Sequence, residues 1–303
     1  MNTTNNLNKM LVSLDLTEID AEMIQYAAFF SQILDSERVC FVHAIQAYDL
    51  PGKAGKKIPE MHTSIRETIE AGIDRVVTSH FKKNTQTEII IQTEEEDAAR
   101  GVLEIIKKRK IGLTLIGQKY GTDREGRYGK KIALSAPSDV MFIPEKPPVS
   151  AKNIFCAVDF SGDSESAFRK ALKISRVTGG SLTCFYIFDA SKSYFPATTT
   201  QTSASIKKNT EKKFKKFLQK FGLSPSSING VIDINDRLTA QAKKLYSKAE
   251  ETDADLIIIG AKGQTSSITS LLGNVTESLR RMEKDIPVWI VKNPKNKKNW
   301  LNL

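Results

Sequence analysis

The sequence predicts an α/β protein of two tandem, doubly wound domains, each with a mainly parallel five-stranded sheet flanked by helices in a Rossmann-like arrangement. Short apolar runs alternate along the whole chain with longer segments whose apolar residues have helical spacing. This succession occurs twice, and in each copy an aspartate ends the first strand and a glycine ends a later one. Ligands of such sheets bind beyond the carboxyl ends of the strands, so these residues mark the expected site.

Three landmarks indicate that the second half of the chain repeats the first. Each recurs after 143 or 144 residues: Asp15 and Asp159, His43 and Tyr186, Gly117 and Gly260. Such constant spacing predicts a duplicated domain. A proline-rich linker, Pro144 to Pro148, divides a domain of residues 1–146 from one of residues 147–303. We expect the two to pack as a pseudo-dimer whose last strands meet edge to edge, because this pairing removes exposed sheet edges.

Composition limits the classes of function. The chain has 303 residues, of which 40% are hydrophobic and 26% charged, as in a globular protein of about two domains. It lacks both an apolar run of the ~20 residues that span a bilayer and the start of a secretory signal, so we expect a cytoplasmic protein without membrane insertion. The net charge is +10, but scattered and terminal lysines favour solvated helix faces over specific nucleic-acid binding.

Cysteine and histidine offer little for a metal site or for catalysis. The three cysteines lie in apolar runs, which predicts reduced, buried thiols: Cys40, Cys156 and Cys184. With only three histidines, a zinc site has few candidate ligands. His43 ends an apolar strand, where a hydrogen-bonded structural histidine is more common than a catalytic one.

In the first copy, apolar runs predict five strands and periodic segments predict three helices. The strands are expected at 10–15, 38–45, 88–92, 112–117 and 139–143, and the helices at 17–34, 63–83 and 93–110. Prolines and glycines make 48–61 a loop. The acids Glu94 to Asp97 fit the N-terminal end of the third helix. The segment after Gly117 is expected to be a charged, glycine-rich loop.

The second copy follows the same plan. Strands are expected at 153–159, 181–188, 230–234, 256–260 and 286–291, and helices at 164–177, 205–221, 237–251 and 274–284. Gly179 and Gly180 end the first helix, and a Ser/Thr-rich loop covers 190–205. In the lysine-rich helix, Phe214 and Phe217 are expected to face the core while the lysines form a solvated face. Trp289 is expected in core or interface packing.

A glycine pattern follows the apolar strand 256–260. Its spacing is Gly260-x2-Gly263-x9-Gly273, and a helical segment starts at Asn274. Glycine permits a tight turn or the close approach of a ligand to the backbone. The free N–H groups and the dipole of the following helix favour an anion. The pattern therefore predicts a phosphate-sized site.

These residues resemble a tandem universal stress protein, within a superfamily of adenine-nucleotide-binding α/β folds. The resemblance covers nearly the whole chain and is more specific in the second half. It implies that ATP or AMP binds there, that Asp159 contacts the ribose or adenine and that Ile187 lines the adenine pocket. Slow ATP hydrolysis would require Mg²⁺ at the phosphates. Phosphate contacts are implied for Gly260, Gly263, Gly273, Asn274, Val275 and Thr276, beside Lys262, and the site is completed by Ala157 and Ile259.

Both copies depart from the family pattern. The family usually has Ser or Thr where Asn274 stands, although Asn can also cap a helix and donate to phosphate. In the first copy Tyr120 stands where Gly263 would be, and the distance from the loop glycine to the last strand is five residues shorter. We interpret this copy as a degenerate site with a structural or dimerising role. The alternative is a different anion site made by Lys119, Arg124, Arg127, Lys130 and Lys131.

Several motifs allow a structural interpretation as well. Asp15 and Asp159 are also candidates to cap the helices that follow them. The run from Ser161 to Ser164 is similar to the pyrophosphate loop of nucleotide-activating enzymes, but it lacks paired glycines, and Ser164 fits a helix N-cap better.

The sequence thus predicts a cytoplasmic stress-response protein whose second domain binds ATP or AMP as a regulatory module, with a protein partner or a homodimer. The first alternative is a scaffold that binds no nucleotide. The weaker alternative is a nucleotide-activating enzyme or slow ATPase. No water-activating base can be assigned, so efficient catalysis is not expected.

Overall fold

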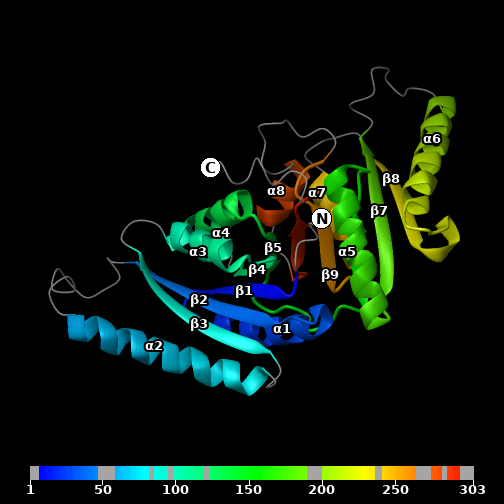
Figure 1. Ribbon diagram of the computed structural model, residues 1–303. Coiled ribbons are helices and arrows are strands. Elements are labelled where there is room, and N and C mark those ends of the chain that lie inside the picture. Colours follow the sequence, from blue (N-terminus) through cyan, green and yellow to red (C-terminus); the bar gives the residue numbers. More distant parts are fainter. Residues whose placement is uncertain are drawn as a thin grey trace. The chain divides into compact units, whose positions relative to one another are not determined.

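The computed structural model describes residues 7–46, 59–81, 85–94, 98–118, 123–189, 200–235, 241–263, 274–281 and 285–293 (Figure 1). The chain divides into two compact units. Unit 1 comprises residues 1–149 with the segments 283–287 and 294–303, and unit 2 comprises residues 150–282 with 288–293. Each unit is an α/β structure with a parallel sheet, as the sequence predicts.

The sheet of unit 1 has the strand order β3-β2-β1-β4-β5, with all four pairings parallel. Its helices α1 and α2 pack together on one face, and α3 packs with α4 on the other (Figure 1). The elements are β1 (Lys9–Leu14), α1 (Ile19–Leu34), β2 (Arg38–Gln46), α2 (Pro59–His80), β3 (Gln86–Glu94), α3 (Ala98–Arg109), β4 (Leu113–Gly117), α4 (Asp123–Ser135) and β5 (Asp139–Ile143).

Unit 2 has the equivalent strand order, β8-β7-β6-β9-β10, again with parallel pairings. From β6 the chain adds strands first on one side and then on the other, so the order reverses between β6 and β9. The elements are β6 (Asn153–Ala157), α5 (Gly162–Thr178), β7 (Ser181–Asp189), α6 (Thr200–Gln219), the 3-10 turn η3 (Pro225–Ser227), β8 (Asn229–Asn235), α7 (Gln241–Glu251), β9 (Leu256–Gly260), α8 (Asn274–Arg281) and β10 (Val288–Val291).

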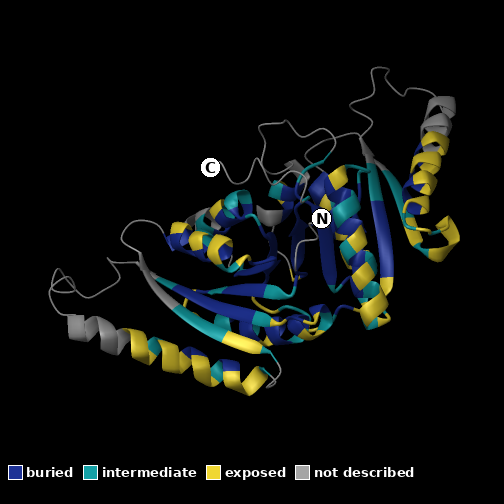
Figure 2. Cartoon of the chain, viewed as in Figure 1, coloured by how far each residue is buried: buried dark blue, intermediate teal, exposed yellow. Residues whose placement is uncertain are grey.

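Several strands lie wholly within the core of their unit. Every residue of β5, β9 and β10 is buried, because helices cover both faces of the sheet (Figure 2). Trp289 on β10 is fully buried, which agrees with its predicted packing role. Phe214 and Phe217 on α6 are buried as predicted, while the lysines on either side of them are exposed.

Uncommon backbone conformations recur at matching positions in the two units. In each unit one left-handed residue follows the aspartate that lies just after the first strand, another caps the end of the first helix, and a third precedes the fourth strand. The pairs are Leu16 and Phe160 (φ 62° and 63°), Asp35 and Gly179 (54° and 66°), and Lys110 and Asp253 (54° and 48°). Because non-glycine residues rarely adopt this conformation, the agreement indicates that the local chain path is the same in both units.

One helix was not predicted from the sequence. Helix α4 occupies most of the segment expected to be a charged, glycine-rich loop. Gly126 and Gly129 are poor helix formers and concealed it. Gly129 packs tightly, because a Cβ at this position would come within 3.1 Å of the ring of Phe142. The buried pair Ile132 and Ala133 anchors the helix to the core.

Some boundaries also differ from the predictions. Helix α2 starts inside the predicted loop 48–61, at Pro59, since proline is favoured in the first turn of a helix. Helix α6 starts at Thr200, inside the predicted Ser/Thr-rich loop. Glu94 ends β3 and α3 starts at Ala98, so the acids predicted to open this helix lie before it or outside the described residues.

The cysteines are buried and free, as predicted. Burial, together with the Glu88 carboxylate, raises the pKa of the Cys40 thiol to about 11. Burial also raises the pKa of Cys156 and Cys184, which face each other on neighbouring strands. A raised pKa keeps a thiol protonated, and only the thiolate is a good nucleophile.

We therefore predict that none of the three thiols reacts within minutes with Ellman's reagent at pH 8 in the folded protein. In guanidinium chloride all three should react at once. The absorbance of the released thionitrobenzoate measures both reactions. Rapid release of one equivalent from the folded protein would contradict this prediction.

Candidate functional site

Two loops of unit 2 meet where the strand order reverses. Strands β6 and β9 are parallel neighbours, with Ala157 opposite Ile259, so their carboxyl ends lie at the same edge. Asp159 lies two residues after β6, and Gly260 ends β9. In open parallel sheets this point of reversal is where ligands bind. The structure thus brings the predicted aspartate and glycine loop together.

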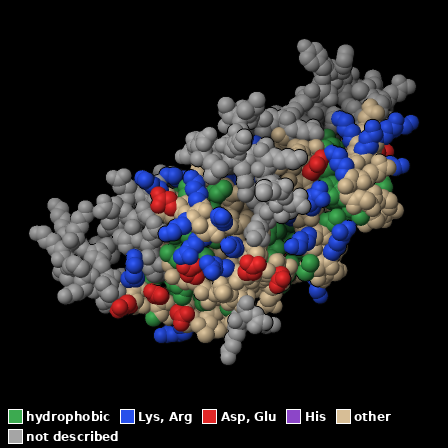
Figure 3. All heavy atoms as spheres, viewed as in Figure 1, with side chains coloured by type: hydrophobic (Ala, Val, Ile, Leu, Met, Phe, Trp, Pro, Cys, Tyr) green, Lys and Arg blue, Asp and Glu red, His purple; other side chains and the backbone are tan. Residues whose placement is uncertain are grey.

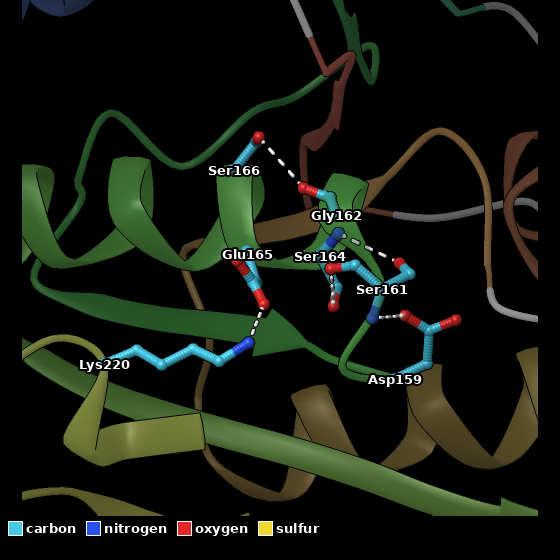
Figure 4. A network of polar contacts seen from close by, with 7 residues as sticks. All are labelled: Asp159, Ser161, Gly162, Ser164, Glu165, Ser166 and Lys220. Atoms are coloured by element: carbon cyan, nitrogen blue, oxygen red, sulfur yellow. Dashed lines mark hydrogen bonds and ion pairs between the residues drawn. The ribbon is translucent and has the colours of Figure 1, made fainter. Parts of the chain in front are cut away.

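The turn after β6 is fixed by local hydrogen bonds (Figure 4). Phe160 has a left-handed backbone, and its ring stacks on Tyr186 with 4.6 Å between centroids. This turn directs the Ser161 N–H toward the Oδ1 of Asp159, at 3.0 Å. Asp159 therefore stabilises the turn and does not cap α5.

The N-cap of α5 is Ser161. Its Oγ accepts a hydrogen bond from the N–H of Ser164 at 3.2 Å. The prediction that Ser164 caps this helix is wrong, because the helix starts two residues earlier, at Gly162. The Ser164 hydroxyl instead donates to the carbonyl of Ser161 at 3.0 Å (Figure 4).

Gly260 is required by the close approach of α5. A Cβ on Gly260 would lie 2.8 Å from the carbonyl carbon of Asp163 and 2.9 Å from the nitrogen of Ser164. Both are backbone atoms of a helix, so they cannot move aside as a flexible side chain would. A glycine at this position lets the first turn of α5 rest on the end of β9.

Three side-chain hydrogen bonds then hold the start of the glycine loop. The Lys262 N–H donates to Oδ2 of Asp163 at 3.1 Å, and the Ser161 hydroxyl donates to the carbonyl of Lys262 at 3.2 Å. From α8, the hydroxyl of Thr276 donates to the carbonyl of Gly260 at 3.0 Å. We refer to the contacts of Ser161, Asp163 and Thr276 with this loop as the loop clamp.

The loop clamp was missed at the sequence level. Asp163 is 97% buried, and Lys262, which it holds, lies 99 residues further along the chain. A buried carboxylate needs a hydrogen-bond partner, so an acid close to the predicted glycine loop could have suggested a contact with that loop. The 144-residue repeat offered a second signal. The first copy has Ile19 at the position of Asp163, so the acid is not required by the fold that the two copies share.

The predicted site residues fall into three groups. Some are buried, three at the ends of β6 and β9 and one on α8: Ala157, Ile259, Gly260 and Thr276. Others are partly exposed, Ile187 within β7 and the rest in loops: Asp159, Ile187, Lys262 and Gly263. Asn274 and Val275 begin α8, although their side chains lie outside the described residues, as does Gly273. Strand β7 extends two residues beyond Ile187, which is therefore not its last residue.

The same edge of unit 1 has different chemistry. Gly117 ends β4 as Gly260 ends β9, but a Cβ there would meet only side-chain atoms, two carbons of Ile19 at 3.4 and 3.5 Å and the sulfur of Met23 at 3.7 Å. The Tyr128 hydroxyl of α4 hydrogen-bonds to Ser13 near the end of β1, at 2.6 Å. By the pairing register, Ser13 has the place that Ala157 has in unit 2. A tyrosine side chain therefore reaches the edge at which a ligand would lie.

Other predicted residues of unit 1 have structural contacts. Asp15 accepts a hydrogen bond from the Thr17 hydroxyl and does not cap α1. The Nδ1 of His43 contacts the carbonyl of Leu14 at 3.0 Å, which fits the structural role expected of it. Of the alternative anion site, Lys130 and Lys131 lie on α4, while the side chains of Lys119, Arg124 and Arg127 are outside the described residues.

Two absences concern the described part of the chain alone. No group of three or more His, Cys, Asp or Glu side chains is arranged there to hold a metal ion. None of the helices described combines the length and the apolar character needed to cross a bilayer.

The fold and the loop geometry of unit 2 define a class: parallel α/β domains with a glycine loop at the strand-order reversal. Residues 150–292 match the model of the universal stress protein family. This part of the chain therefore carries one universal stress protein domain.

Curated relatives and solved structures agree with this result. A Staphylococcus epidermidis protein named as a universal stress protein is 27% identical over 137 residues, which are 44% of this chain and 80% of the relative. A Staphylococcus haemolyticus relative is 28% identical over 134 residues, 43% and 78% of the two chains. The crystal structure of a universal stress protein from Archaeoglobus fulgidus covers 95% of this chain and 99% of its own at a TM-score of 0.67. Its 18% identity makes this a likeness of fold.

The contrast between the two loop glycines gives a stability prediction. Gly260→Ala should lower the free energy of unfolding by about 1–3 kcal/mol, because the new Cβ would press on helix backbone. Gly117→Ala is the matched control and should change it by less than about 0.5 kcal/mol. Urea unfolding followed by circular dichroism measures both. Equal effects of the two substitutions would show that close packing is not what requires Gly260.

Proposed function

We propose that unit 2 binds an adenine nucleotide, ATP or AMP, in a cytoplasmic stress-response protein that the nucleotide regulates. The observation that carries this proposal is the meeting of Asp159 with the glycine loop at the reversal of strand order. Three residues are partly exposed and so remain accessible to a ligand: Asp159, Lys262 and Gly263. The match to the universal stress protein family supports the same site.

Each residue has a distinct role in this proposal. The Asp159 carboxylate would accept hydrogen bonds from ribose or adenine, and Ile187 would contact the base. The phosphates would lie over Gly263 and the start of α8, whose free N–H groups favour an anion. The Lys262 ammonium would balance part of their charge, and Mg²⁺ would supply further charge neutralisation. No residue is assigned as a base, so the proposal is binding rather than turnover.

A second candidate, a scaffold that binds no nucleotide, has a specific observation in its favour. The Lys262 N–H and the Thr276 hydroxyl, two groups that could donate to phosphate, already donate inside the loop clamp. The Asp163 carboxylate next to them would repel a phosphate. In this case the loops would serve a protein partner or a homodimer.

For unit 1 we propose a second, degenerate domain of the same type, so that residues 1–146 and 147–303 are tandem copies. Support comes from the equivalent strand orders and the recurring left-handed positions. The Tyr128–Ser13 hydrogen bond and Ile19 in place of Asp163 support loss of binding there. The pseudo-dimer packing of the two copies stays a prediction.

The test begins with the purified protein. Denaturation and ion-exchange chromatography of the supernatant should release up to one adenine nucleotide per chain. Calorimetric titration of nucleotide-free protein with ATP and Mg²⁺ should then give one site. Asp159→Ala should weaken binding tenfold or more, since hydrogen bonds to a charged group contribute about 1.5–3 kcal/mol. Gly263→Tyr, which copies the first loop, should abolish it.

Asp15→Ala is the matched control in unit 1 and should leave the affinity unchanged. Absence of bound nucleotide and of any heat with ATP and Mg²⁺ would reject the proposal and favour the scaffold. Steady formation of ADP or AMP that is lost in Asp159→Ala would favour an enzyme instead.

A further inference from the structure

A basic groove lies on unit 2 at the other end of α5 from the loop clamp. Helix α5 and the chain just after α6 enclose about 400 Å³ there. Four cationic side chains line the groove: Arg169, Lys173, Arg176 and Lys220. All four are exposed. In the view of Figure 3, lysine and arginine side chains lie over the part of the molecule that contains α5 and α6, as they also do over the part that contains α3 and α4.

The two segments that form this groove lack acids over long stretches. No Asp or Glu occurs in residues 166–188 or 212–229, which hold nine lysines and arginines. Lys220 pairs with Glu165 from the first turn of α5 (Figure 4). Within the described residues, Lys173 and Arg176 pair with no carboxylate. The groove therefore keeps a net positive charge.

Apolar side chains lie among these cations. Leu172 and Phe221 are partly exposed, and Val177 is 55% exposed, more than any other large apolar side chain in the described part of the chain. Together these three side chains form a small apolar surface among the cations, and its burial by a partner would add to the affinity. A highly hydrated polyanion would offer nothing apolar to bury there.

The aromatic ring in the groove is not free for base stacking. The guanidinium of Arg169 lies over the Phe221 ring, 5.1 Å from its centroid. Phe168 and Phe217 contact the same ring, with centroids 4.8 and 5.2 Å away. Single-stranded nucleic acids gain much of their affinity from open aromatic faces, so these contacts favour a protein ligand.

We propose that this groove docks an acidic segment of a partner protein that also carries an apolar anchor residue. Arg169, Lys173 and Arg176 follow an i, i+4, i+7 spacing along one face of α5. At 1.5 Å per residue they span about 10 Å of helix axis. Carboxylates at the same spacing on a partner helix match them, and a leucine between the carboxylates would cover Val177.

The test uses the full-length chain and a fluorescein-labelled 15-residue helical peptide. The peptide carries glutamates at i, i+4 and i+7 with leucines between them, and a control peptide has glutamine in place of glutamate. Fluorescence anisotropy measures the affinity at two salt concentrations. We expect the glutamate peptide to bind, and its affinity to fall with added salt, because surface charges are screened.

Three variants separate the groove from overall charge. Lys173→Glu with Arg176→Glu should lower the affinity at least about tenfold. Val177→Ser should lower it about threefold to tenfold with an unchanged salt dependence. The control is the double substitution Lys107→Glu with Lys108→Glu, at exposed positions of α3, which makes the same change in net charge. Its affinity for the glutamate peptide should stay within about twofold of that of the wild type. Circular dichroism confirms that each variant is folded.

Three results would overturn the proposal. The first is that the wild type does not bind the glutamate peptide. The second is that the double substitution in the groove and the double substitution on α3 lower the affinity for the peptide equally. The third is that a 15-nucleotide single-stranded DNA binds more tightly than the peptide and that the groove substitutions weaken its binding. The nucleotide site is assessed separately, because Asp159→Ala should bind the peptide as the wild type does.

Discussion

The contact between the first turn of α5 and the end of β9 determines the geometry of the candidate site. Gly260 lets helix backbone approach to a distance that any Cβ would prevent. This approach carries Asp163 to the Lys262 amide, and places the Ser161 hydroxyl on the carbonyl of the same residue. Burying the Asp163 carboxylate is costly, but its position in the first turn of a helix and its amide partner offset that cost. These contacts therefore hold the backbone at the start of the glycine loop in one position.

The two units show that backbone path and site chemistry vary independently. Both place a left-handed residue after the first aspartate, and both end the fourth strand with a glycine. In unit 1, however, Ile19 replaces the acid of the loop clamp, and Tyr128 reaches the end of β1. The shared features are those that sheet and helix packing require. The features that differ are polar contacts at the loop edge, where a ligand would act.

Sequence reasoning was strongest where burial alone determines structure. The apolar runs predicted each strand of the described residues, and most clearly the buried ones such as β5, β9 and β10, because strands covered on both faces need no polar alternation. It failed for α4, where Gly129 lowers helix propensity but lets the helix approach Phe142. It also failed for the loop clamp, since Asp163 and Lys262 are 99 residues apart and no local pattern joins them. Contacts of this kind depend on tertiary packing.

Helix α5 connects the two surfaces of unit 2, and its charges cannot be explained by the helix dipole alone. The acids Asp163 and Glu165 in its first turn fit the dipole, and so does Arg176 in its last turn. Arg169 and Lys173 lie mid-helix, where the dipole has little effect, and the nearest acid of the helix, Glu165, pairs with Lys220. A helix that needed only solubility would carry both signs there, because i,i+4 pairs add stability. The excess of positive charge at this face is complementary to an acidic partner segment.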